Sequence, residues 1–174
     1  DIVAMVVADD ATTAEDALEQ INVRYDGMPA VTDVYAAIAD GAPQLYAEYP
    51  HNIAFDWHAG EHEATDKALE SAEANGYEIF DIDVINNRVI INSMETRPII
   101  VEPGDEGDSL NVWCGTQGPV GIARQLTKAL GMQDGTVRVR TGDVGGGFGF
   151  KIFLHPEQLI TAWAARKLGM RVRW

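Results

Sequence analysis

Four glycines within five residues make the segment 141–151 the part of the chain best suited to binding chemistry. It reads Thr-Gly-Asp-Val-Gly-Gly-Gly-Phe-Gly-Phe-Lys. Glycine tolerates positive φ and lets consecutive backbone N–H groups face a ligand, so the main chain can hold an anionic or oxo group. Phe148 is unusual among these glycines, because a plain turn favours Asn or Asp. A glycine-rich turn that serves packing alone is the alternative interpretation.

The glycine segment fits neither common nucleotide-binding fingerprint. The pattern G-x-G-x-x-G/A fails from Gly145, because Phe150 stands at its last position, and from Gly142, because Val144 stands at its third. The phosphate-binding pattern G-x-x-x-x-G-K-[ST] needs glycine directly before the lysine, and Phe150 precedes Lys151. ATP binding is therefore disfavoured.

A second segment matches a zinc-protease signature. His58 and His62 belong to the sequence His-Ala-Gly-Glu-His, which has the H-x-x-E-H spacing. That chemistry needs both histidines on one face of a continuous helix, where they share a zinc ion. Gly60 interrupts the segment, and the predicted helix begins after it, over residues 61–74. Zinc hydrolysis through His58, Glu61 and His62 is therefore a remote alternative, and no third ligand suggests itself.

Cys114 is the only cysteine of the chain. It has no partner for an internal disulfide, and an iron–sulfur cluster normally takes four cysteine ligands, so this chain alone holds none. Because Cys114 follows the apolar run 110–113, we interpret it as a small residue at a strand end rather than a reactive thiol. This cysteine usage favours a reducing, cytoplasmic location.

The formal net charge of −14 conceals two differently charged parts. Residues 1–118 carry 24 acidic and 4 basic side chains, whereas residues 119–174 carry 3 acidic and 9 basic ones. The acidic part argues against nucleic-acid binding. The basic part, which contains the glycine segment, fits either a phosphorylated cofactor or a docking face for an acidic partner subunit. No stretch approaches the roughly 18 consecutive apolar residues that a membrane-spanning helix needs.

Alternating strand and helix patterns predict the elements that position these residues. The glycine segment lies between a predicted strand and a predicted helix that begins at Pro156. The segment 41–50 has little periodicity and two prolines, so it is a candidate linker. Strands are predicted over residues 2–8, 52–57, 110–115, 137–140 and 171–174, with one strand or a hairpin over 79–92. Helices are predicted after a cap at Thr12 or Thr13, and over 61–74, 119–130 and 156–168.

Four segments together resemble the molybdenum-binding large subunit of the xanthine dehydrogenase, aldehyde oxidase and carbon monoxide dehydrogenase family. Residues 14–30 look like the end of that family's α/β hammerhead domain, and residues 92–97 (Asn-Ser-Met-Glu-Thr-Arg) are similar to its Asn-x-Met-Glu-Pro-Arg motif. Residues 116–119 and 143–149 look like its two cofactor-contact loops. The last two are the most specific, because their composition, order and spacing all agree.

The resemblance implies a mixed α/β (α+β) fold. Its expected parts are the end of a hammerhead-like domain over 1–40, a linker over 41–50, and the first part of a molybdopterin-binding domain over 51–174. The chain lacks an initiating methionine and opens and closes inside predicted strands, so we expect a fragment of a longer polypeptide.

The resemblance also implies a hydroxylase with a molybdenum–molybdopterin cofactor, the cytosine dinucleotide form being one version of the pterin. Gln117 matches the glutamine whose amide donates to an oxo ligand, although a solvated loop glutamine is the alternative. Gly147 would allow the main chain of Phe148 and Gly149 to contact the cofactor. The metal would be held by pterin sulfurs, so no protein metal ligand is expected. FAD and 2Fe-2S clusters would belong to partner subunits or domains.

Several residues depart from the family's pattern. Ile152 stands where purine-oxidising members have glutamate, and Phe150 makes the pocket edge more apolar, so an aldehyde or an aromatic heterocycle is favoured over a purine. Thr96 replaces a usual proline. Glu95 and Arg97 are expected to pair with parts of the protein outside this chain.

The resemblance places no catalytic residue in this chain, because the family's base glutamate lies downstream. We therefore expect the isolated chain to be inactive, and a non-catalytic binding or assembly module of a redox complex is the alternative function. Carbon monoxide oxidation also stays open, because the loop that distinguishes it lies downstream as well.

Overall fold

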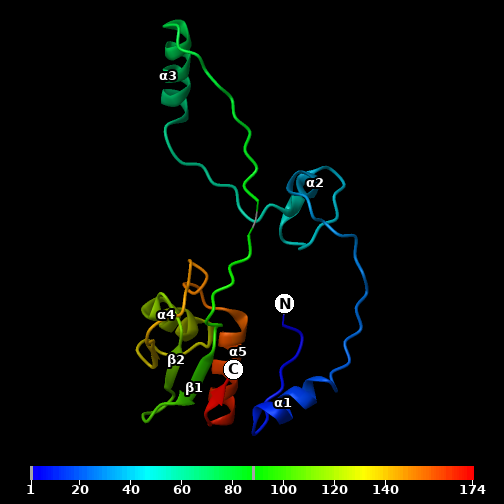
Figure 1. Cartoon of the computed structure of the whole chain (residues 1–174), viewed down its shortest axis with the longest axis vertical. Helices are drawn as coiled ribbons and strands as arrows, with labels where there is room; N and C mark the ends of the chain where they lie inside the picture. Colours follow the sequence, from blue (N-terminus) through cyan, green and yellow to red (C-terminus); the bar gives the residue numbers. More distant parts are fainter. Residues whose placement is uncertain (1, 88) are drawn as a thin grey trace. The chain divides into compact units, whose positions relative to one another are not determined.

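The computed structural model describes residues 2–87 and 89–174 (Figure 1). The chain divides into two units. Residues 1–22 together with 88–174 form one, here called the sheet unit, and residues 23–87 form the second unit. The sheet unit contains all the strands found among the described residues and both segments that resemble cofactor loops. Mixed α/β architecture is therefore confirmed, whereas the predicted domain boundaries stay a prediction.

A mixed sheet with strand order β3-β2-β1-β4 is the centre of the sheet unit. Strands β1 (Ile99–Pro103) and β2 (Leu110–Cys114) are antiparallel, with Ile99 opposite Cys114. Strand β3 (Val137–Arg140) runs parallel to β2, and β4 (Val172–Arg173) is antiparallel to β1. The predicted strands at 110–115, 137–140 and 171–174 are confirmed.

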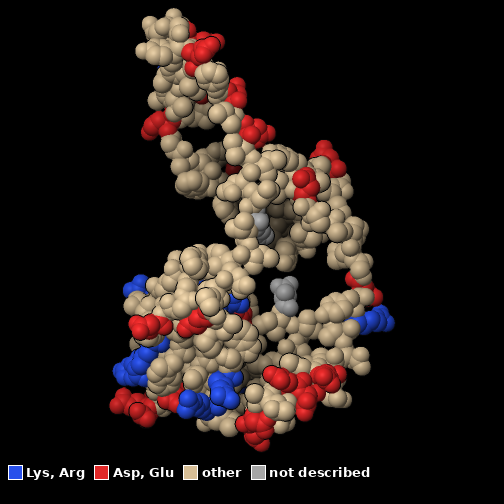
Figure 2. Space-filling view, in the orientation of Figure 1, with Lys and Arg blue, Asp and Glu red and all other residues tan. Residues whose placement is uncertain are grey.

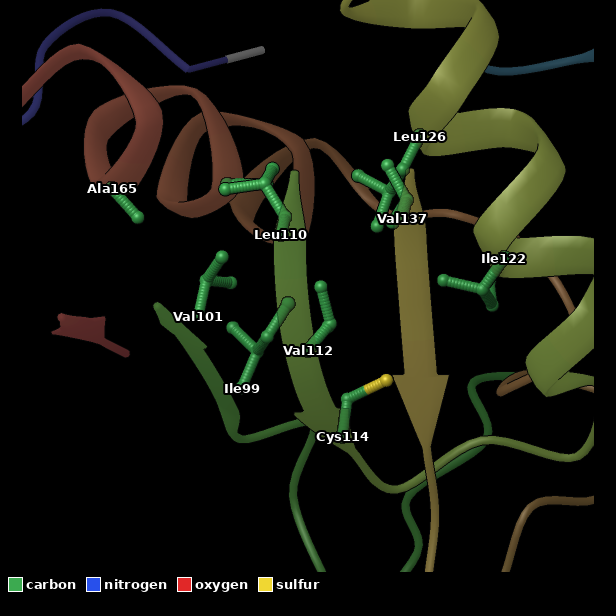
Figure 3. Packing of buried hydrophobic residues seen from close by; sticks show 10 residues of the cluster. Ile99, Val101, Leu110, Val112, Cys114, Ile122, Leu126, Val137 and Ala165 are labelled. Carbon is green, nitrogen blue, oxygen red and sulfur yellow. The ribbon is translucent and has the colours of Figure 1, made fainter. Parts of the chain in front are cut away.

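Two helices pack on one face of this sheet and close its core. Helix α4 (Pro119–Ala129) connects β2 to β3, and α5 (Pro156–Leu168) follows the glycine segment. Because side chains alternate between the two faces of a strand, Ile99, Val101, Leu110, Val112 and Cys114 all point to the same side. They form one buried cluster with residues of both helices and of β3 (Figure 3), namely Ile122, Leu126, Val137, Ala162 and Ala165.

The predicted helices are confirmed with one correction of a cap. Helix α4 ends before Gly131, and α5 spans the predicted residues, with Gly169 in the left-handed conformation at its end. Helix α1 (Ala11–Leu18) is capped by Asp10 rather than by Thr12 or Thr13. The carboxylate of Asp10 accepts hydrogen bonds from the backbone N–H and from the hydroxyl of Thr13. Asp10 precedes the first turn, so its side chain satisfies a backbone N–H that has no partner within the helix.

The second unit contains helices but no strand among its described residues. Helix α2 (Val34–Ile38) begins after the cap Asp33, and α3 (His62–Ala74) agrees within one residue with the predicted helix over 61–74. The predicted linker is an ordered turn followed by η1 (Pro50–Asn52). The Asn52 amide donates to the carbonyls of Ala37 and Pro43, while its oxygen accepts from the N–H of Leu45.

Three predicted strands are wrong. Described residues of 2–8, 52–57 and 79–92 form no strand, and their side chains are mostly exposed. The apolar patterns are present, but a strand needs a neighbouring strand to receive its N–H and C=O groups, and none pairs with these segments in the described part of the chain. Arg88, which belongs to the predicted segment 79–92, lies outside the described residues, as does Asp1.

Strand β1 is the reverse case: it is a strand in the structure, although no sequence pattern predicted one there. Its sequence Ile-Ile-Val-Glu-Pro lacks clear alternation and ends in proline, which suits an edge or a strand end. Pairing with β2 on one side and β4 on the other makes it a strand. Across residues 2–87 and 89–174, no helix is both long and apolar enough to cross a membrane.

Candidate functional site

Three chain segments meet at one edge of the sheet. The parallel strands β2 and β3 have their carboxyl ends at the same edge, and β1, being antiparallel to β2, begins there. The loops 115–118 and 141–155 leave β2 and β3, and residues 93–98 lead into β1. Ligands commonly bind where loops leave the carboxyl ends of neighbouring parallel strands. The topology therefore brings three of the four family-like segments together.

Gln117 and the glycine loop are in direct contact. The backbone N–H of Gly149 donates to Oε1 of Gln117 at 3.1 Å. Because this hydrogen bond uses the oxygen of the Gln117 amide, the NH₂ group of the amide remains available as a donor. Within the described residues, Nε2 of Gln117 makes no hydrogen bond, and the side chain is exposed. The amide can therefore donate to a group outside this chain.

The glycine at position 147 permits this approach. A Cβ atom on Gly147 would overlap the side-chain amide of Gln117, so no other residue type fits without displacing it. Beside it, Phe148 has φ of 49°, a left-handed conformation that a large aromatic residue rarely adopts. Its side chain is 75% exposed. A strained, exposed aromatic residue suits a loop shaped for a ligand better than one shaped for packing.

Thr116 and Gln117 are tied to the far end of the same loop. The carbonyl of Lys151 accepts from the Thr116 hydroxyl at 2.8 Å and from the Gln117 backbone N–H at 3.1 Å. The Thr116 hydroxyl oxygen also accepts from the N–H of Gly118 at 3.1 Å, and Thr116 is buried. The segment 115–118 is thus held by backbone and hydroxyl contacts that leave the Gln117 amide free to project.

Lys151 and Glu95 form an ion pair that sequence reasoning did not identify. The Lys151 ammonium lies 2.6 Å from Oε2 of Glu95, and the lysine side chain is only 1% exposed. The same carboxylate oxygen accepts from the N–H of Gly145 at 3.0 Å, and the Glu95 N–H donates to the Gly145 carbonyl. The lysine hydrogen bond first, and the Gly145 N–H next, lower the pKa of Glu95.

The prediction that Glu95 and Arg97 pair outside this chain is wrong. Glu95 pairs with Lys151, and Arg97 donates to Glu157 at 2.7 Å, near the start of α5. The Arg97 guanidinium also lies 4.4 Å from the centre of the Phe150 ring. Spacing along the sequence could not reveal partners that are 56 and 60 residues away.

Phe150 is held in place by neighbours on both sides. Its ring meets His155 edge-on, with centroids 4.8 Å apart, and its carbonyl is 2.8 Å from Nε2 of His155. With Arg97, Thr96 and Trp174 it lines a hollow of about 220 Å³ beside the loop. The edge of this hollow is therefore apolar at Phe150 and cationic at Arg97.

The arrangement fits an anionic, oxygen-rich cofactor. It offers one amide donor at Gln117 and a loop free of a side chain at Gly147. The excess of basic side chains in residues 119–174 agrees with this, although Figure 2 shows Lys and Arg interspersed with Asp and Glu on the surface of the sheet unit. The same charge would also suit an acidic partner surface, so both interpretations stay open.

Cys114 is part of the core and not of this site. Burial raises the pKa of its thiol to about 11, so the thiol is protonated near neutral pH. Its side chain packs with Ile99 and Ile122 (Figure 3). The interpretation as a small residue at a strand end is confirmed.

The zinc-protease signature does not assemble. His62 begins α3 and pairs with Asp66 at 2.8 Å, whereas His58 precedes the helix and lies 3.4 Å from Asp56. Gly60 lies between the two histidines and has φ of 95°, which is not a helical conformation, so His58 and His62 do not lie on one face of a common helix. Among the described residues, no group of three His, Cys, Asp or Glu side chains is placed to hold a metal.

Comparison with known proteins agrees with this geometry. The family described as molybdopterin cofactor-binding domain matches residues 45–174. The gamma subunit of the 6-hydroxypseudooxynicotine dehydrogenase complex of Paenarthrobacter nicotinovorans is 30% identical over 175 residues, which cover 99% of this chain and 21% of that protein. The carbon monoxide dehydrogenase large chain of Afipia carboxidovorans is 29% identical over 184 residues, covering 99% and 22%.

Solved structures give the same result. Quinoline 2-oxidoreductase of Pseudomonas putida 86 superposes with a TM-score of 0.73 at 29% identity, over 96% of this chain and 20% of that one. A Cu,Mo-carbon monoxide dehydrogenase superposes with a TM-score of 0.77 at 25% identity, over 96% and 22%. The chain thus spans about a fifth of the length of the relatives it matches. It belongs to the molybdopterin cofactor-binding domain family found in the large subunits of molybdenum hydroxylases.

Proposed function

We propose that this chain forms one wall of the molybdopterin site in the large subunit of a molybdenum hydroxylase. Gln117, Gly147, Phe148 and Gly149 are the contacts. The hydrogen bond between the Gly149 N–H and Oε1 of Gln117 is the observation that carries the proposal. It joins two loops that are distant in sequence and leaves an amide donor facing outward.

The cofactor, when bound, would supply the transfer of two electrons and of a water-derived oxygen. The residues of this chain bind and orient it. The Gln117 NH₂ group donates to an oxo ligand without adding charge, and Gly147 lets the main chain of Phe148 and Gly149 approach. The chain itself supplies no catalytic residue, and no protein metal ligand is needed when the pterin sulfurs hold the metal.

The substrate is proposed to be a small electron-poor molecule. Ile152, which stands where a purine-positioning glutamate would be, is 45% exposed and has no charge to offer a purine. Phe150 adds an apolar edge to the neighbouring hollow. An aldehyde or an aromatic N-heterocycle suits these residues, and the relatives named for quinoline and 6-hydroxypseudooxynicotine support the heterocycle. The relatives named for carbon monoxide keep that substrate open.

The electron acceptors are proposed to lie outside this chain. A single buried cysteine leaves this chain unable to ligate an iron–sulfur cluster, so 2Fe-2S clusters and FAD belong to partner subunits or domains. Relatives named as a complex subunit and as a large chain support such an assembly. The cytosine dinucleotide form of the pterin and a cytoplasmic location belong to the same proposal.

Elemental analysis of the protein purified from its source tests the proposal. Cells are supplied with molybdate, the protein is captured with an antibody to this segment, and molybdenum is normalised to polypeptide. Near-stoichiometric molybdenum is expected, with Gln117→Ala lowering it and His58→Ala leaving it unchanged. A protein without molybdenum would contradict the proposal and favour a non-catalytic assembly module.

A further inference from the structure

The loop that carries the proposed cofactor contacts is anchored at both of its ends by one pair of side chains. Lys151 closes the loop, and its buried ammonium reaches Oε2 of Glu95 at 2.6 Å. Gly145 opens the glycine run, and its N–H donates to that same oxygen at 3.0 Å. The Glu95 carboxylate therefore bridges the two ends of the segment 145–151.

Lys151 also connects the loop to Gln117. Its carbonyl accepts from the Gln117 N–H and from the Thr116 hydroxyl, while its side chain reaches Glu95. Three separate segments, 93–97, 115–118 and 145–151, thus converge on this one residue. A shift of Lys151 would move the Gln117 amide and the Gly149 N–H relative to each other.

The space around Glu95 is shaped for its side chain. A Cβ on Gly145 would lie 2.5 Å from Cβ of Glu95, and a Cβ on Gly115 would lie 2.8 Å from its carboxylate oxygen. Both glycines thus serve the fit of Glu95 rather than the cofactor. Such fitted, buried charge pairs often contribute little net stability, since desolvation offsets much of their attraction. What such pairs usually contribute is specificity, because they favour one conformation of the segments that they join.

From this geometry we infer that Glu95 and Lys151 are positioning residues, which hold the 145–151 loop in the conformation that binds the cofactor. This inference rests on the proposed function for the nature of the ligand. The ordering of the loop itself is a property of this chain and can be measured without any cofactor.

The test replaces the pair by uncharged side chains in the protein purified from its source. E95L/K151M removes both charges together, so no unpaired charge is left buried, and it also removes the acceptor for Gly145. D108L/R166M is the control for the loss of an ion pair as such, because Asp108 and Arg166 form a more exposed ion pair in the same unit, between the β1–β2 turn and α5. E95Q/K151M keeps an acceptor oxygen for Gly145 and is the more conservative second variant.

Hydrogen exchange on protein made without molybdate gives the first measurement. In E95L/K151M, peptides spanning 142–151 are expected to exchange at least about tenfold faster than in the control variant, while α5 peptides stay protected. E95Q/K151M is expected to show a smaller acceleration at the same peptides. Where E95L/K151M fails to fold, E95Q/K151M decides. Loop exchange equal to that of D108L/R166M would overturn the inference.

Molybdenum per polypeptide, in cells supplied with molybdate, gives the second measurement. We expect less than half of the wild-type content in E95L/K151M and a wild-type content in D108L/R166M. Equal molybdenum in a variant whose loop exchanges faster would show that loop order does not govern cofactor binding, and it would overturn the inference. A wild-type protein lacking molybdenum would instead contradict the proposed function, and the exchange measurement would still decide on the loop.

Discussion

Gly147 and Gln117 approach each other so closely that a side chain at position 147 would displace the Gln117 amide. We expect Gly147→Ala to push the Gln117 amide away, to break its hydrogen bond with Gly149, and to reduce bound molybdenum several-fold. Overpacking of this kind costs about 1–3 kcal/mol where the neighbour cannot move, and less where it can. Molybdenum content and loop hydrogen exchange measure the effect.

Gly142 offers a matched control for that substitution. A Cβ on Gly142 would meet no atom within 4 Å, and its φ is not in the left-handed region. Gly142→Ala should therefore leave both molybdenum content and exchange near the wild-type values. Equal losses in the two variants would mean that the loop tolerates no added methyl group anywhere, which would contradict a specific role for Gly147.

The Cys114 thiol gives a prediction about pH. Its pKa is raised from 9.0 to about 11 by burial, so near pH 8 the native protein contains about a hundredfold less thiolate than an unfolded chain does. We expect iodoacetamide to label the Cys114 peptide about a hundred times more slowly in native than in denatured protein. Rapid native labelling at pH 8 would show that the thiol is accessible.

The same shift makes stability depend on pH in a defined window. Because the pKa of Cys114 is raised in the folded state, the folded protein binds this proton more tightly than the unfolded chain does. The contribution of this proton to the free energy of unfolding is fully present below pH 9. It is lost as the pH rises from 9 toward 11. Cys114→Ser, whose hydroxyl does not ionise there, should remove that part of the alkaline loss in urea unfolding.

At the scale of elements, α4 is held to the sheet by Ile122 and Leu126. Both side chains are fully buried, whereas Val120 on the same helix is 64% exposed. Leu126→Ala is expected to lower the free energy of unfolding of the sheet unit by about 2–5 kcal/mol, through lost burial and a residual cavity. Val120→Ala should change it by less than about 0.5 kcal/mol. Urea unfolding of the purified protein compares the two.

The elements that the sequence predicted correctly are those with strong local determinants. Helix α5 begins at a proline, has a capping box between His155 and Gln158, and ends at a left-handed Gly169. Helix α4 likewise begins at Pro119. Prolines at the first helical turn and glycines after the last one act within a few residues, so a sequence pattern is enough to locate these helices.

At the scale of the whole molecule, the two units differ in how much apolar surface they bury. The second unit leaves large apolar side chains in water, among them Phe55, Trp57, Phe80 and Ile82, each more than 70% exposed. The sheet unit buries its core completely at Ile99, Val101 and Val112. Segments with few buried contacts open easily and are cut by proteases first.

Limited proteolysis of the isolated chain should therefore cut within residues 50–87 first. A resistant C-terminal product that begins between residues 51 and 88 and ends at Trp174 is expected, identified by mass spectrometry. The same isolated chain should show no substrate-dependent dye reduction, because it supplies only one wall of the proposed site. First cuts inside α4 or α5, or measurable activity, would contradict these expectations.

The sequence by itself determined the glycine loop, its flanking strand and helix, and the family resemblance, because each depends on residues close together in the chain. Through that resemblance it also singled out Gln117 and Gly147, each as an expected contact of the cofactor, whereas their contact with each other came from the tertiary structure. Tertiary structure alone decided that the described residues of 79–92 form no strand and that 99–103 do, since a strand exists only beside another strand. It also revealed the pairing of Glu95 with Lys151, because an ion pair between residues 56 apart is created by the sheet that brings three loops to one edge.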